Sequence, residues 1–296
     1  MQKTRIFTGA AVAVVTPFKD NALDYESLGR IIDWQIENKT DAIVIAGTTG
    51  EGSTLTDEEH REIIRFSVEH IAGRVPAIAG TGSNDTDYAI SLSKYACEVG
   101  ADALLVVSPY YNKATPAGLI KNFSAIEAAT DKPIILYNVP SRTGCNITLP
   151  VYKELAKHDR IVAVKEASGN ISQIAEIAAE CGDSLDIYSG NDDQIVPILS
   201  LGGIGVISVL SNIMPRETHD MVELWHTGRV KEASIMQLKL LDIINAIFCE
   251  VNPIPVKAAM AEMGWCSNEI RLPLTEIEPE HKEKLLKVMR RHGLVN

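Results

Sequence analysis

The sequence predicts a (β/α)8 barrel (a TIM barrel) that is followed by a C-terminal helical extension. Eight short runs rich in valine, isoleucine and alanine begin near Ala10, Ala42, Pro76, Ala103, Pro133, Ile161, Leu185 and Gly203. Each run is continuously apolar, as parallel strands covered on both faces are, and a segment with helical periodicity follows it. Eight such units in about 225 residues fit a closed barrel. A doubly wound open sheet is the alternative, but no GxGxxG follows the first run.

Helix boundaries are marked between these strands. Residue pairs typical of helix starts are Thr56 with Glu59, Asn170 with Gln173, and Thr115 before Pro116. Glycines stand where helices are expected to end, at Gly73, Gly100 and Gly182. Local chemistry therefore agrees with the strand and helix order.

The alternation stops near residue 228, and only helical patterns follow. The segments are VKEASIMQLKLLDIINAIFCE, then PIPVKAAMAEMG, then a charged stretch from Glu278 to Arg291. We therefore expect two parts, a catalytic barrel over 1–228 and a helical extension over 229–296.

Composition limits the class of partner. The chain has 296 residues, 46% of them apolar, and a formal charge of -11 with no basic stripe. This argues against nucleic-acid or membrane partners and favours a small molecule. The five cysteines form no CxxC, and no segment is long and apolar enough for a membrane span, so we expect a protein of the reducing cytoplasm.

Chemistry in such a barrel is expected where strands end. Those ends read AGTTGEGS, AGTGSND, VVSPYYNK, LYNVPSRTG, VKEASGN, YSGNDD and GVISVLSN. All seven histidines fall in predicted helices or at their ends, so a histidine metal site or a histidine base is hard to assemble, and we expect no metal.

Lys165 is the first candidate for chemistry, because it ends the apolar run IVAVK. Burying an ammonium group is costly unless the group is paired or loses its proton. A free amine in a dry barrel is a nucleophile that forms Schiff bases with carbonyl compounds. The alternative is a buried ion pair with Glu166 or another carboxylate, although adjacent strand residues point to opposite faces.

Three neighbouring motifs strengthen the nucleophile hypothesis. Tyr137 ends the preceding strand and could carry protons in place of a histidine, or it could be a core-edge tyrosine. GTTGEGS could bind a carboxylate through backbone N–H groups, or it could be a plain turn. Arg142 could clamp a carboxylate, or it could be a solvated loop arginine. Tyr110 and Tyr111 must diverge, so at least one of them should reach another surface.

Together, these motifs resemble the dihydrodipicolinate synthase (4-hydroxy-tetrahydrodipicolinate synthase) family of pyruvate-dependent class I aldolases. The resemblance rests on GTTGEGSTL, SPYYNK, YNVPSRTG, VKEASGN, SGND, GGIGVISV and NPIPVKAAM, and it covers nearly the whole chain. It implies a lyase of the diaminopimelate and lysine pathway that needs no cofactor. Lys165 would form a Schiff base with pyruvate, and the resulting enamine would attack L-aspartate 4-semialdehyde.

The resemblance also implies a role for each site residue. The catalytic set is Lys165, Tyr137, Thr48 and Tyr111, with Tyr111 crossing a tight dimer interface into the neighbouring site. The substrate-binding set is Thr48 and Thr49 for the pyruvate carboxylate, Arg142 for the semialdehyde carboxylate, and the backbones of Gly190 and Ile207 as pocket lining. Family members are homotetramers built from tight dimers.

Two other functions remain open. The first is a pyruvate aldolase acting on a sugar acid, of the N-acetylneuraminate lyase or keto-deoxy-gluconate aldolase type. Those enzymes resemble this chain in the lysine and the tyrosine, but they usually lack an arginine matching Arg142. The second is a non-catalytic barrel that binds or regulates, although none of the expected residues is missing.

Inhibition by lysine is expected to be weak or absent. In lysine-sensitive relatives the effector binds among positions matching Gly52, Ser53, Asp57, His60, Asn84, Tyr88 and Tyr110. His60, Asn84 and Tyr110 fit that pattern. Tyr88 replaces a glutamate that usually binds the ammonium group, and Asp57 stands where a histidine is common. The redox sensitivity of Cys145, close to Arg142, is an open question.

Overall fold

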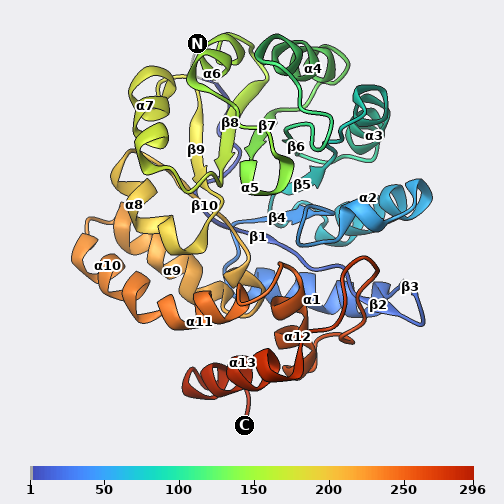
Figure 1. The fold of residues 1–296 in the computed structure, drawn as a ribbon, viewed down its shortest axis with the longest axis vertical. Coiled ribbons are helices and arrows are strands. Elements are labelled where there is room, and N and C mark those ends of the chain that lie inside the picture. The colour runs from blue at the N-terminus through green and yellow to red at the C-terminus, as the bar shows by residue number, and fades with distance from the viewer. Residues whose placement is uncertain (1–2) are drawn as a thin grey trace.

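The computed structural model describes residues 3–296, which fold around a closed barrel of eight parallel strands (Figure 1). The barrel strands are β1 (Gly9–Ala13), β4 (Ala42–Ile45), β5 (Ala77–Gly80), β6 (Ala103–Val107), β7 (Ile134–Asn138), β8 (Ile161–Glu166), β9 (Asp186–Ser189) and β10 (Gly205–Ser208). Their order around the barrel is β1-β10-β9-β8-β7-β6-β5-β4. The predicted fold class and all eight predicted strands are confirmed. A short antiparallel pair, β2 (Phe18–Lys19) and β3 (Ala22–Leu23), was not predicted.

Helices cover the outside of the barrel (Figure 1). They are α1 (Tyr25–Glu37), α2 (Asp57–Ile71), α3 (Thr86–Glu98), α4 (Pro116–Ala128), α5 (Pro140–Thr143), α6 (Leu149–Leu155), α7 (Ile171–Cys181), α8 (Ile195–Ser200) and α9 (Pro215–His226), with short 3-10 turns η1 (Gly52–Thr54), η2 (Asp192–Gln194) and η3 (Leu210–Asn212). The predicted capping box is present, because Thr56 accepts from the Glu59 N–H and Glu59 accepts from the Thr56 N–H. Pro116 is the first residue of α4, as expected.

The C-terminal segment is helical, as predicted, and its first helix lies beside α8 and α9 (Figure 1). It contains α10 (Val230–Lys239), α11 (Leu241–Ile247), α12 (Ile254–Glu262) and α13 (Pro279–Arg291). The stretch expected as one helix after residue 229 is divided at Leu240 into α10 and α11. The boundary at residue 228 stays a prediction. Within residues 3–296, no helix has the length and apolar character needed to span a bilayer.

The apolar core has two layers. One layer fills the barrel and includes Ala11, Val44, Ile78, Ile135, Ala163 and Ile207, and a larger layer lies between the strands and the helices. Phe7 closes the amino-terminal end, where its ring stacks on Tyr188 at 4.3 Å. The Tyr188 hydroxyl donates to the Phe7 carbonyl at 2.7 Å. Polar groups inside the barrel are thus left for its carboxyl end.

Candidate active site

Lys165 and Tyr137 lie side by side at the carboxyl ends of β8 and β7. The two residues are register partners in the parallel ladder, so both side chains point to the same face of the sheet. The Lys165 Nζ is 4.3 Å from the centroid of the Tyr137 ring. Both residues are buried, with 5% and 6% of their surface exposed. An amine therefore lies over the ring of a phenol in a mostly dry setting.

Glu166 is not the partner of Lys165. Its side chain is fully buried on the opposite face of β8, and its carboxylate accepts hydrogen bonds from Asn138 Nδ2 at 3.1 Å, the Ser168 N–H at 2.9 Å and the Tyr152 hydroxyl at 3.0 Å. Burial raises the pKa of Glu166. Among residues 3–296, no ion pair joins Lys165 to a carboxylate, which leaves its amine available for chemistry.

Asp192 is a buried carboxylate near Lys165 that sequence reasoning missed. Its Oδ2 accepts from the N–H groups of Val209 and Leu210 at 3.0 and 2.9 Å, while its Oδ1 has no hydrogen-bond partner. Burial raises the pKa of Asp192, and the positive charge of Lys165 opposes that rise. The YSGNDD strand end was the available signal, but it did not show which of its acids faces the barrel.

The GTTGEGS segment forms a closed turn after β4. The Glu51 N–H donates to the Thr48 carbonyl at 3.1 Å, and the Gly52 N–H donates to the Gly47 carbonyl at 3.2 Å. Thr49 is buried, and its hydroxyl oxygen accepts from Asn252 Nδ2 at 3.0 Å. Asn252 belongs to the NPIPVKAAM motif, for which sequence reasoning gave no role.

A cavity of about 530 Å³ opens beside this turn. Thr48, Tyr137 and Arg142 line it; Thr48 follows β4, and the other two belong to the end of β7 and the short α5 after it. Arg142 is exposed, and its Nη2 donates to the Asn252 carbonyl at 3.0 Å. A guanidinium group at the mouth of a cavity with hydroxyls inside it suits a ligand that carries carboxylates.

Gly190 lies beside Lys165, and Ile207 belongs to the core inside the barrel. A Cβ atom added at Gly190 would be 3.2 Å from Lys165 Cε, so the absence of a side chain makes room for the lysine. Ile207 is fully buried in β10, opposite Ala11 of β1. Whether their backbones line a bound substrate stays a prediction.

The structure does not bring Tyr111 or Asn84 into the cavity of this chain. Tyr111 is 88% exposed and has a φ of 74°, a left-handed conformation that is uncommon for a bulky residue. The Asn84 carbonyl accepts from Asn112 Nδ2 at 2.8 Å, outside the residues that line the cavity.

The predicted effector residues His60 and Tyr110 line the same cavity, together with Tyr88 and Asp57. The His60 Nε2 is 2.9 Å from the Gly80 carbonyl, and burial lowers the pKa of this histidine, so it is neutral at pH 7. The Asp57 carboxylate already pairs with Arg61 at 2.9 Å. An effector ammonium group would have to compete for it.

Cys145 is buried close to Arg142, with its Sγ 3.8 Å from the Ala114 carbonyl. Burial raises the pKa of its thiol, so little of the reactive thiolate is present at pH 7. This lowers the expected sensitivity of the site to oxidation.

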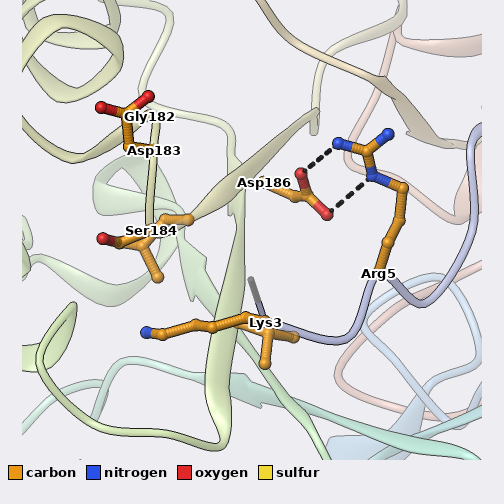
Figure 2. Close-up of a pocket in the computed structure, with 8 residues that line it drawn as sticks. Lys3, Arg5, Gly182, Asp183, Ser184 and Asp186 are labelled. Carbon is orange, nitrogen blue, oxygen red and sulfur yellow. Dashed lines mark hydrogen bonds and ion pairs between the residues drawn. The ribbon is translucent and has the colours of Figure 1, made fainter. Parts of the chain in front are cut away.

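A second cavity, of about 480 Å³, lies at the amino-terminal end of the barrel (Figure 2). Its two cationic groups are already bound within the chain. Lys3 Nζ donates to the carbonyls of Ala156 and Ile161 at 2.7 Å, and Arg5 pairs with Asp186 through two hydrogen bonds, which Figure 2 shows. No predicted site residue lines this cavity.

One cluster of possible metal ligands occurs among the described residues, on α9. It comprises His219, Asp220 and Glu223. His219 Nδ1 is 2.8 Å from Asp41 Oδ2, and Lys39 Nζ is 3.4 Å from Asp220. Lys39 thus already supplies positive charge to this cluster, which lies away from the carboxyl end of the barrel.

Comparison with known proteins agrees with this geometry. The model of the dihydrodipicolinate synthetase family matches residues 6–292. The 4-hydroxy-tetrahydrodipicolinate synthase of Caldicellulosiruptor saccharolyticus is 58% identical over 290 residues, which cover 98% of each chain. The crystal structure of dihydrodipicolinate synthase from Aquifex aeolicus is 45% identical, covers 97% of this chain and 99% of its own, and superposes with a TM-score of 0.96.

A further crystal structure, of the enzyme from Cyanidioschyzon merolae with lysine bound, is 40% identical, with a TM-score of 0.95 and coverage of 99% of this chain and 100% of its own. High identity over nearly the full length, together with the closed barrel and the Lys165–Tyr137 pair, leads to one assignment. The chain belongs to the dihydrodipicolinate synthetase family.

Proposed function

We propose that the chain is a lyase with 4-hydroxy-tetrahydrodipicolinate synthase activity, which condenses pyruvate with L-aspartate 4-semialdehyde. The observation that carries this proposal is the buried Lys165 amine, which has no ion-pair partner among residues 3–296 and lies 4.3 Å from the Tyr137 ring centroid. Such an amine attacks the keto carbon of pyruvate, and loss of water leaves an imine on Lys165. The chemistry needs no cofactor, because the protonated imine withdraws electrons from the pyruvate methyl group.

Proton transfer is the task of Tyr137. Imine formation needs a proton for the departing water, and the later loss of a proton from the pyruvate methyl group gives the enamine. The enamine carbon attacks the aldehyde carbon of the semialdehyde, whose oxygen takes up a proton. The amino group of the second substrate then attacks the imine carbon, closes the ring and releases Lys165. Thr48, which lines the same cavity, is a suitable relay for these protons.

Substrate recognition follows from two anion sites. The turn with Thr48 and Thr49 presents hydroxyls and backbone N–H groups to the pyruvate carboxylate, and Arg142 binds the semialdehyde carboxylate at the cavity mouth. A pyruvate aldolase that accepts a sugar acid would need hydroxyl-binding groups where Arg142 stands. A coupled assay that offers aspartate semialdehyde and N-acetylmannosamine side by side tests this choice. Turnover of the sugar alone would contradict the proposal.

The proposed assembly is a homotetramer built from tight dimers. Tyr111 supports a dimer, because its exposed side chain is free to complete the site of a second copy. Ile235 and Leu238 on α10, 55% and 70% exposed, offer a second apolar surface. Sedimentation analysis tests the tetramer. The proposed location is the cytoplasm, in keeping with five free cysteines.

A further inference from the structure

We propose that the ion pair of Glu51 and Lys257 positions the turn that carries Thr48 and Thr49, and so makes pyruvate binding depend on helix α12. This inference rests on the proposed function, because it assigns Thr48 and Thr49 to the pyruvate carboxylate. Lys257 Nζ is 2.5 Å from Glu51 Oε1, and the two side chains are 0% and 1% exposed. Both motifs, GTTGEGS and NPIPVKAAM, were noted in the sequence, but these two residues had no role.

Glu51 holds the turn together from within. Its N–H donates to the Thr48 carbonyl at 3.1 Å, and its own carbonyl accepts from the Thr54 N–H at 3.0 Å. Its φ of 54° lies in the left-handed region, which a glutamate adopts only when its surroundings hold it there. The conformation of the turn therefore depends on what binds the Glu51 side chain.

The C-terminal segment binds both oxygens of that side chain. Lys257 of α12 takes Oε1, and the Arg271 N–H donates to Oε2 at 3.1 Å. Both cations lie over the ring of Phe18, itself fully buried, with Lys257 Nζ 4.1 Å and Arg271 Cζ 4.2 Å from the ring centroid. The carboxylate is thus fixed in direction and kept from water.

A third contact from the same segment reaches the substrate site directly. Asn252, two residues before α12, donates from Nδ2 to the Thr49 hydroxyl oxygen and accepts from Arg142 through its carbonyl. A shift of α12 would therefore move both the turn that carries Thr49 and the side chain of Arg142. Displacement of Thr48 and Thr49 weakens contacts with the pyruvate carboxylate, whereas Tyr137 and Lys165 stay on their strands.

Energetics favour a positioning role over a purely stabilising one. A buried ion pair recovers little more than the cost of removing both charges from water, and its replacement by uncharged groups is often neutral for stability. Removing one partner alone is strongly destabilising, because it leaves an unpaired buried charge. A double replacement can therefore keep the fold while releasing the turn.

The test compares Glu51→Gln, Lys257→Met and the double variant with the wild-type chain. In the double variant, the glutamine oxygen can still accept from the Arg271 N–H. We expect each single variant to melt well below the wild type and the double variant to recover most of that loss. The double variant should nevertheless show a KM for pyruvate raised about tenfold, and slower borohydride trapping of pyruvate, with a smaller change in kcat.

The matched control is the pair Glu262 and Lys282, which joins α12 to α13 at 2.7 Å on the surface. The double variant Glu262→Gln/Lys282→Met removes an ion pair from the same segment but should leave the pyruvate KM unchanged. Glu51→Asp is a milder variant that keeps the charge and shortens the reach to Lys257. It should fold and raise the pyruvate KM about threefold, in line with a displaced turn.

Two results would overturn the inference. One is a folded double variant with wild-type pyruvate KM and trapping rate. The other is a double variant that melts as early as the single variants, because the pair would then serve the fold and not the turn. If the wild-type chain itself traps no pyruvate, the proposed function fails instead, so the two failures are distinguishable.

Discussion

Replacing Gly190 by alanine is expected to displace Lys165 and slow the reaction. The added Cβ would lie 2.6 Å from Ala167 Cβ, 3.1 Å from the Glu166 carbonyl oxygen and 3.2 Å from Lys165 Cε. Carbon atoms in ordinary contact are about 3.5 to 4.0 Å apart, so one of the crowded groups must move by about 1 Å.

The strain is expected at the end of β8, because hydrogen bonds hold the backbones of Gly190 and Ala167 in place. The Gly190 N–H donates to the Glu166 carbonyl at 2.8 Å, and the Ala167 N–H donates to the Asn138 carbonyl at 2.9 Å. A misplacement of about 1 Å in a reacting group can cost about 10²-fold in rate. Overpacking should also lower the free energy of unfolding by about 1 to 3 kcal/mol.

The assay is kcat/KM in the coupled reaction, together with the rate of pyruvate trapping by borohydride and the melting temperature. Gly118→Ala is the control, since its Cβ would meet nothing nearer than Thr115 Oγ1 at 3.4 Å, and it lies in helix α4. It should keep full activity and gain about 0.5 to 1 kcal/mol in stability. A Gly190→Ala variant with activity within about twofold of the wild type would refute this reasoning.

Three other changes test separate parts of the structure. Tyr137→Phe should lower kcat by about 10² to 10⁴-fold with little change in pyruvate KM, and an unchanged kcat would exclude Tyr137 as the proton carrier. Thr56→Ala removes the acceptor for the Glu59 N–H and should cost about 1 kcal/mol of unfolding free energy without changing kcat, as a denaturant melt and a rate assay would show. Added lysine should inhibit weakly or not at all. Tyr88 has no negative charge to pair with the ammonium group of the effector, and Asp57 is already bound to Arg61. The lack of a buried charge partner typically lowers the binding free energy by about 2 to 5 kcal/mol. An inhibition constant in the low micromolar range would contradict this last expectation.

Local patterns were enough to predict the barrel and the centre of the site. Each strand is buried on both faces, so its apolar run is visible in the sequence without knowledge of its neighbours. The barrel order then places Tyr137 beside Lys165, because consecutive parallel strands pair in register. The alternation of side chains along β8 correctly directed Glu166 away from Lys165.

Contacts between distant segments could not be predicted in this way. Asn252 reaches Thr49 across 203 residues, and Lys257 reaches Glu51 across 206 residues. Such contacts depend on how the C-terminal helices pack against the barrel, and packing leaves no periodic signal in either segment. The inward direction of Asp192 was hidden for a related reason, because it follows from the turn after β9 and not from strand alternation.

The most direct test of the central claim is borohydride reduction of the chain in the presence of pyruvate, followed by mass mapping of the peptides. The proposed mechanism predicts one pyruvate-derived adduct, on the peptide that contains Lys165, and its loss in a Lys165→Ala variant that still folds. An adduct on another lysine, or none at all in an active preparation, would contradict it.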